Sequence, residues 1–363
     1  MIFFLTSILI LLVASRTFGS LFRKLGQPPV IGEIVGGLLL GPTVLGHFLP
    51  DLQQGFFPSS SQGLLAWNFI GQMGLFLLMF YSGMEIRSTF FRNEAKTSLF
   101  VTLSGTLLPF LFGVILFRLI DTQTFLGPAA NKSAFLIVFA IGIAITSIPV
   151  ISRILLDLDL MGTPLARIIL SSAVIEDIVL YAILSSVLIW VGVQGAGGHS
   201  SAWTGLAPMG AFAVGIVTSR LGPKPKKVAD SIKRFSFAFF IPLYFALVGL
   251  KLDLLQNFDT VFFILFLTVA CVVKIGSVYL GSRLANETHL TSLNLGIAMN
   301  ARGGPGLVLA SVSLEAGIIN QNFYAILVLL VMVTSLMAGV WLGRTVDRRE
   351  IAVAPQTAAG EIS

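Results

Sequence analysis

The feature that most constrains this sequence is a pair of adjacent carboxylates, Glu176 and Asp177, inside a long apolar stretch. The stretch runs from about 165 to 193. Because ~20 helical residues cross the ~30 Å core of a bilayer, it is long enough to span a membrane. A charged side chain at mid-membrane depth costs roughly 2.5–3.5 kcal/mol even on lenient insertion scales, so two in succession require a wet cavity or a partner. The pair therefore predicts an ion or proton pathway.

The composition indicates an all-α polytopic membrane protein. The 363 residues are 55% hydrophobic and only 11% charged, whereas soluble domains carry about 25% charged residues. The net charge of +6 does not indicate nucleic acid, because in a membrane protein the placement of positive charges sets the orientation. The His residues are scattered and Cys271 is alone in an apolar run, so neither a metal cluster nor a disulfide is expected. No nucleophile–His pairing is visible, and we expect neither an enzyme nor a cofactor.

Apolar runs of ~17–25 residues between polar or Gly/Pro breaks predict about 11 transmembrane helices. They lie near residues 2–20, 29–48, 64–84, 97–118, 133–156, 165–193, 203–220, 235–251, 259–283, 290–316 and 322–343.

The basic residues orient these spans. Most of the 23 Lys and Arg residues fall in alternate connections, and the other connections hold only Arg118, Lys132 and Lys251. Since Lys and Arg accumulate on the cytoplasmic side, the N-terminus is predicted outside and the C-terminus inside, which requires an odd number of helices. Lys274 and Arg302 fall within spans, and they are the natural partners of the carboxylate pair.

Two triplets of helices form a weak internal repeat, the first over 97–193 and the second over 259–343. The middle helix of each is interrupted, at 146–149 and at 301–306, where Pro149, Gly303, Gly304 and Pro305 oppose helix formation. Each interruption alone would be an ordinary kink. The triplets begin five helices apart and therefore have opposite orientations. Inverted repeats with two broken helices are typical of secondary transporters, which bind substrate where the broken helices meet.

Several motifs, in order, resemble those of the monovalent cation:proton antiporter-2 family, the bacterial sodium/proton and potassium/proton exchangers. LGQPPVIGEI at 25–34 with LGP at 40–42 is similar to that family's second-helix motif, and FYSGME at 80–85 to the end of its third helix. The segment 146–153, the pair Glu176–Asp177, Lys274 and the NARG of 300–303 follow in the family's order.

The resemblance implies an inverted-repeat transporter fold and a homodimer in the bacterial cytoplasmic (inner) membrane. It also implies the following division: scaffold and dimerisation helices over 1–96, core repeat A over 97–193, a shortened scaffold over 194–258, core repeat B over 259–345, and a disordered cytoplasmic tail over 346–363. Family members typically have thirteen helices. The missing pair falls at 192–204, where the tether between the mobile core and the scaffold would stand, so the sequence leaves open whether transport survives.

Asp177 is the predicted ion and proton carrier. A carboxylate is neutralised either by a hard cation or by a proton, and competition between the two for one site is antiport in its simplest form. The alternative is a structural salt bridge. Glu176 lies 100° round the helix from Asp177, so it is either a second proton site or the partner of a core cation.

The other candidate residues surround this carrier. The resemblance implies that Lys274 forms a salt bridge with the carboxylate pair that breaks when the cation binds, and the alternative is a static link between the sixth and ninth helices. For Arg302 we favour a structural role, hydrogen-bonding freed carbonyls or neutralising Glu176. Thr146 and Ser147 offer the oxygen ligands that Na⁺ prefers.

The sequence therefore predicts a secondary active transporter that exchanges Na⁺ or K⁺ for protons across a lipid membrane by alternating access. Departures from the family pattern leave one alternative, a transport-incompetent relative acting as a membrane scaffold or regulatory subunit. A sodium-coupled solute symporter is disfavoured, because the spans lack long polar patches and Lys274 is charged. Cation selectivity and the net charge moved per cycle are not determined by the sequence.

Overall fold

A computed structural model describes residues 2–57, 61–85, 94–194, 199–220, 226–256 and 258–347, and these residues are almost entirely helical. The helices are α1 (Ile2–Lys24), α2 (Pro29–Leu40), α3 (Leu45–Phe48), α4 (Pro50–Phe56), α5 (Ser61–Glu85), α6 (Ala95–Leu119), η2 (Gln123–Phe125), α7 (Lys132–Ala144), α8 (Ile148–Asp157), α9 (Pro164–Gln194), α10 (His199–Arg220), α11 (Lys226–Ala238), α12 (Phe240–Leu250), α13 (Thr260–Leu284), α14 (His289–Ala298), α15 (Gly303–Glu315) and α16 (Gln321–Asp347).

The predicted spans correspond one to one with helices, or pairs of helices, in the described residues. Eight segments are long and apolar enough to cross a membrane by themselves. The remaining predicted spans are α10 and the interrupted pairs α7–α8 and α14–α15. The predicted tail at 346–363 lies almost wholly outside the described residues.

Two predicted spans are less regular than expected. The span at 29–48 ends as a helix at Leu40, because the chain is extended at Gly41 and Pro42 has no N–H with which to continue the helix. The span at 235–251 is divided at Phe239, which has a non-helical backbone (φ −127°, ψ −66°) between α11 and α12.

Helices α1, α2, α5, α10 and α12 pack against one another. Their backbones approach closely where glycines face the neighbouring helix, as small residues allow in membranes. At the α2–α12 crossing, a Cβ on Gly37 would collide with the carbonyl of Ala246, and one on Gly249 with the carbonyl of Ile34.

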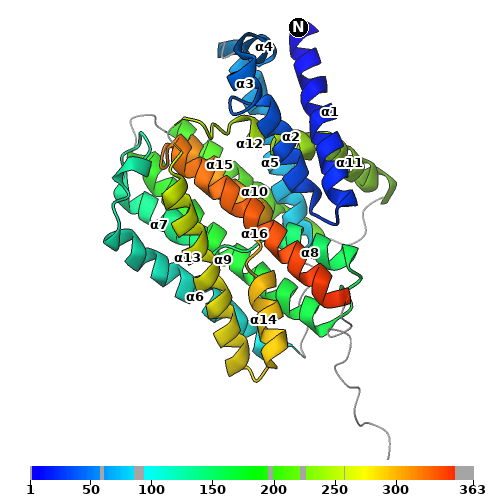
Figure 1. The fold of residues 1–363 in the computed structure, drawn as a ribbon, viewed down its shortest axis with the longest axis vertical. Coiled ribbons are helices and arrows are strands. Elements are labelled where there is room, and N and C mark those ends of the chain that lie inside the picture. The colour runs from blue at the N-terminus through cyan, green and yellow to red at the C-terminus, as the bar shows by residue number, and fades with distance from the viewer. Residues whose placement is uncertain are drawn as a thin grey trace, which may run out of the picture.

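The second group contains α6, α7, α8, α9, α13, α14, α15 and α16. Figure 1 shows α6, α13 and α14 at one end of the molecule, away from α1, α2 and α4. The segments before α7 and after α15 pair as a short antiparallel bridge at Leu126 and Ile319, so they lie on the same side, as the predicted topology requires.

Candidate functional site

The site is built on two unwound stretches, each in the middle of a predicted span. Helix α7 ends at Ala144 and α8 begins at Ile148. Helix α14 ends at Ala298 and α15 begins at Gly303. The breaks predicted at 146–149 and 301–306 are therefore present as unwound residues 145–147 and 299–302. The residues predicted to cause them, Pro149, Gly303, Gly304 and Pro305, lie in the first turns of α8 and α15. Proline fits a first helical turn because no N–H is needed there.

The two unwound stretches contact each other. The hydroxyl of Thr146 donates a hydrogen bond to the carbonyl of Met299 (2.7 Å). The hydroxyl oxygen of Ser147 caps α8 by accepting from the N–H of Val150 (3.4 Å). Gly303 has a positive φ of 28°, and a Cβ there would collide with the Ser147 hydroxyl. The broken helices thus cross at Ser147 and Gly303; the hydroxyl of Thr146 bonds across the crossing, and that of Ser147 caps its own helix α8.

Glu176 and Lys274 form an ion pair inside this second group of helices. Lys274 Nζ lies 2.9 Å from Glu176 Oε2, and both side chains are completely buried. The ammonium also donates to the carbonyls of Gly105 in α6 (2.7 Å) and Ala144 at the end of α7 (2.6 Å). A lysine has three N–H donors, and here each has an acceptor. Of the two alternatives open for Glu176, the geometry shows the partner of a core cation.

Asp177 is buried without a partner. Its side chain is 1% exposed, and neither carboxylate oxygen has a hydrogen bond among the described residues. One turn later lies Tyr181, whose buried hydroxyl likewise has no hydrogen bond within the part of the chain that the structure describes. The Tyr181 ring contacts Phe212 of α10, with a centroid separation of 5.1 Å. Because residues four apart share a helix face, Asp177 lies on the side of α9 that faces the first group of helices. The adjacent carboxylates therefore have different surroundings.

Arg302 joins both unwound stretches. Its guanidinium is fully buried and donates to the carbonyls of Gly142 (3.1 Å) and Ile143 (3.0 Å) in the last turn of α7. It also donates to the carbonyl and side-chain oxygen of Asn300 (3.1 and 2.7 Å) and to the carbonyl of Ala270 in α13 (3.1 Å). All five donors of the guanidinium are thereby used. Hydrogen bonding to freed carbonyls, one of the two roles considered for Arg302, is what the geometry shows.

Sequence reasoning missed Gly105 and Tyr181. Gly105 lies against the ion pair, since a Cβ there would be 3.0 Å from Glu176 Oε1 and 2.8 Å from Val278 Cγ2. Gly105 stands four residues before Pro109, and Tyr181 four residues after Asp177. Tyr181 could have been found from the sequence, because it lies four residues after Asp177 and therefore on the same helix face.

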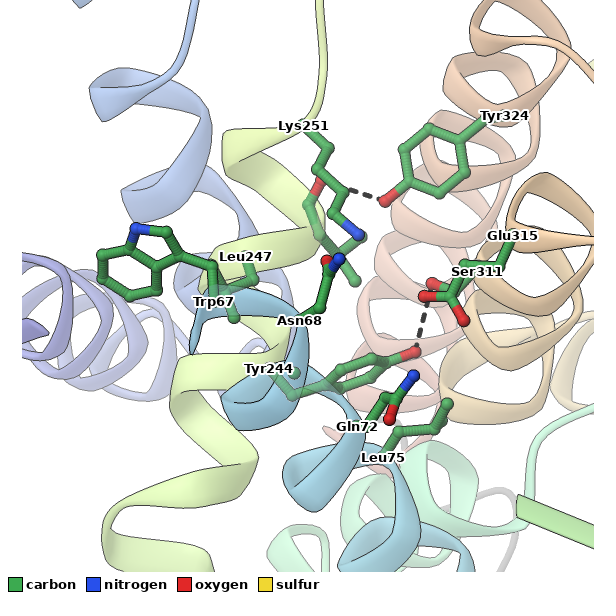
Figure 2. A pocket seen from close by; sticks show the side chains of 12 residues that line it. Trp67, Asn68, Gln72, Leu75, Tyr244, Leu247, Lys251, Ser311, Glu315 and Tyr324 are labelled. Carbon is green, nitrogen blue, oxygen red and sulfur yellow. Dashed lines mark hydrogen bonds between the residues drawn. The ribbon is translucent and has the colours of Figure 1, made fainter. Parts of the chain in front are cut away.

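A small cavity lies between the two groups of helices, where α5 and α12 face α15 and α16 (Figure 2). Its volume of about 30 Å³ has room for about two water molecules. Two tyrosines bound it: the hydroxyl of Tyr324 donates to the carbonyl of Val248 (3.1 Å), and that of Tyr244 lies 3.4 Å from the Ser311 hydroxyl. Glu315 and Lys251 also line it.

Two discontinuous helices that cross beside buried charges are the arrangement typical of inverted-repeat secondary transporters. The model of the sodium/hydrogen exchanger transmembrane family matches residues 8–208 and 205–348, and the chain belongs to that family. The two matched stretches meet close to 192–204, where the sequence predicts the missing helix pair.

Named relatives and a solved structure agree with this assignment. The chain is 26% identical to the Na⁺/H⁺ antiporter NhaS4 of Synechocystis, over 92% of this chain and 94% of the relative. It is 26% identical to cation/H⁺ antiporter 17 of Arabidopsis thaliana over 91% of this chain, and it spans about half (47%) of that relative's length. The sodium–proton antiporter MjNhaP1 of Methanocaldococcus jannaschii has the same fold, with a TM-score of 0.63 and 13% identity, covering 96% of this chain and 98% of that one.

Proposed function

We propose that this protein exchanges a monovalent cation, Na⁺ or K⁺, for protons across a membrane, with Asp177 as the carrier. The observation that carries the proposal is the contrast between the two adjacent carboxylates. Glu176 is occupied by Lys274, whereas Asp177 is fully buried with both oxygens free of hydrogen bonds among the described residues. An unpartnered carboxylate at this depth is costly, and a proton or a cation relieves that cost.

The packing supports alternating access. Asp177 and Tyr181 lie on the face of α9 directed toward α10, at the boundary between the two groups of helices. We assign the group containing α1, α2, α5, α10 and α12 to the scaffold and the group containing both broken helices to a moving core. Motion at this boundary would open Asp177 to one side of the membrane and then the other, and the carboxylate would exchange its proton for a cation. The cation is the transported substrate, and no enzymatic step or cofactor is required.

The carrier role of Asp177 is tested in vesicles that contain the purified protein. An outward proton gradient should drive Na⁺ or K⁺ uptake, and Asp177→Asn should reduce the uptake to that of empty vesicles. The amide keeps the size of the side chain but cannot take up a proton or hold a cation as a counter-charge. Asp51→Asn, on the exposed helix α4, is the matched control and should transport normally. Normal uptake by Asp177→Asn would overturn the assignment.

One observation favours a second candidate, a transport-incompetent relative that acts as a membrane scaffold or regulatory subunit. Helices α9 and α10 are separated only by residues 195–198, where the family resemblance implies a further pair of helices. Expression in a salt-sensitive cell without its own exporters separates the candidates. Rescue of growth that requires Asp177 supports exchange, and absence of rescue by a correctly inserted protein supports the scaffold role.

The same proposal includes the membrane in which the protein lies, its orientation and its oligomeric state. We place it in the cytoplasmic membrane of a bacterium, with the N-terminus outside and the C-terminus inside, because Lys and Arg accumulate on alternate connections. A homodimer through the scaffold helices is proposed from the family resemblance. Crosslinking in native membranes tests the dimer, and labelling of single cysteines introduced into the connections tests the orientation.

A further inference from the structure

The Lys274 ammonium takes one of its three acceptors from the middle of a helix. Gly105 lies well inside α6, where a backbone carbonyl normally accepts a hydrogen bond from the N–H four residues later. That carbonyl nevertheless accepts from Lys274 Nζ at 2.7 Å. The residue four positions after Gly105 is Pro109, which lies buried inside the same helix and has no N–H.

We infer that Pro109 is a positioning residue for the ion pair, because it leaves the Gly105 carbonyl without a helical donor and so available to the Lys274 ammonium. The inference concerns the geometry of the ion pair. It rests on the proposed function only for the statement that Lys274 contributes to transport. With the Gly105 carbonyl, the Ala144 carbonyl and the Glu176 carboxylate, the ammonium has one acceptor for each N–H. The three acceptors belong to α6, α7 and α9, so Lys274 of α13 joins four helices.

Gly105 and Pro109 act as a unit on one face of α6. The absence of a side chain at Gly105 lets the Glu176 carboxylate come close, since a Cβ would be 3.0 Å from Oε1 and 3.7 Å from Lys274 Nζ. Pro109 supplies the free carbonyl. The same face continues at Gly113, where a Cβ would be 2.8 Å from the Cα of Ala140 in α7. The spacing of four residues places Gly105, Pro109 and Gly113 on one face of α6.

The scaffold shows a related contact at a helix end. Pro242 lies in the first turn of α12, and the carbonyl four residues earlier belongs to Ala238. That carbonyl accepts a hydrogen bond from the guanidinium of Arg16 (2.7 Å). In both places a carbonyl four residues before a proline accepts from a cationic side chain on another helix. The causes differ, because Ala238 ends α11 and its carbonyl lacks a helical donor at that helix end, and its bond to Arg16 is exposed.

The test measures whether Pro109 acts through Lys274. Pro109→Ala restores an N–H that competes for the Gly105 carbonyl, and Lys274→Met removes the ammonium. The unfolding temperature of the purified protein in detergent is measured for the wild type, both single variants and the double variant. We expect Pro109→Ala to lower the unfolding temperature by several degrees more in the wild-type background than in the Lys274→Met background. Equal changes in the two backgrounds would overturn the inference.

A second variant separates the missing N–H from the shape of the proline ring. Incorporation of an α-hydroxy acid at position 109 replaces the proline with an ester linkage that also lacks an N–H. This variant should keep the wild-type unfolding temperature and rate of cation uptake, whereas Pro109→Ala should lower both. If the ester variant instead has a lower unfolding temperature and slower cation uptake, as expected for Pro109→Ala, the inference is overturned. Pro208→Ala, inside α10, is the matched control and should show no coupling to Lys274→Met. Because the coupling is a stability measurement, it holds or fails independently of whether the protein transports cations.

Discussion

Lys274 and Glu176 form a fully buried ion pair across 98 residues of sequence, with Nζ 2.9 Å from Oε2, while the neighbouring Asp177 has no partner among the described residues. The carboxylate that is unpaired can bind and release a cation without first breaking this bridge. The ion pair joins α13 to α9 in this structure. Two adjacent carboxylates therefore differ, one being held in an ion pair and the other being the carrier that we propose.

Removal of Lys274 alone should be strongly destabilising. Lys274→Met leaves Glu176 buried without its cation, and breaking such a pair typically costs ~3–5 kcal/mol. The double variant Lys274→Met/Glu176→Gln removes both charges and should recover most of that loss. Chemical unfolding in detergent measures the free energy of unfolding of the single and the double variant. A double variant as unstable as the single one would contradict the view that the unpaired charge is the cause.

Arg302→Lys should behave as a severe change rather than a conservative one. The guanidinium makes five hydrogen bonds, and an ammonium has only three donors, so at least two carbonyl or amide acceptors lose their partner. Each unpaired buried acceptor costs ~1–3 kcal/mol. Thermal unfolding in detergent should show the loss. Stability equal to that of the wild type would mean that Arg302 does not hold the crossing of the broken helices.

Gly303→Ala should disrupt the crossing. The added Cβ would collide with Ser147 Oγ and Val150 Cγ2, and the positive φ is unfavourable for alanine. We expect a loss of ~1–3 kcal/mol in stability, as for overpacked cores, together with reduced cation uptake. Gly276→Ala is the matched control, because nothing lies within 4 Å of its Cβ in α13. The control should be neutral or slightly stabilising, since alanine favours helix.

Tyr324→Phe tests the closure of the cavity. The Tyr324 hydroxyl bonds to the Val248 carbonyl, and such a bond contributes ~1 kcal/mol, about a fivefold change in an equilibrium. If α16 moves relative to α12, loss of the bond favours the form in which these two helices are apart and the cavity is open. A cysteine at Gln72, introduced in a Cys271→Ala background, should then react about fivefold faster with a water-soluble maleimide. An unchanged reaction rate would indicate that α12 and α16 do not separate there.

Much of the fold was predictable, because in a membrane protein hydropathy and backbone chemistry act locally. The residues that interrupt α7–α8 and α14–α15 are visible as prolines and glycines in apolar spans. The exact residues at which these helices unwind were not predictable. The unwound residues precede Pro149 and Pro305, since proline opposes continuation of the preceding helix but fits the first turn of the next. The end of α2 before Gly41 and Pro42 and the break at Phe239 were missed, although the first has a local cause in the extended Gly41 and the missing N–H of Pro42.

The sequence by itself determined that two carboxylates lie deep in a membrane helix, that two cations lie in other spans, and that two helices are broken. These conclusions need only the cost of placing charge and unpaired backbone groups in hydrocarbon. Only the tertiary structure decided which carboxylate meets Lys274, that Gly105 supplies a third acceptor, and that Arg302 uses all five donors. The physical reason is that adjacent residues differ by 100° around a helix, and the partner helices lie from 32 to 160 or more residues away in the chain. No local pattern specifies which helix occupies each of those directions.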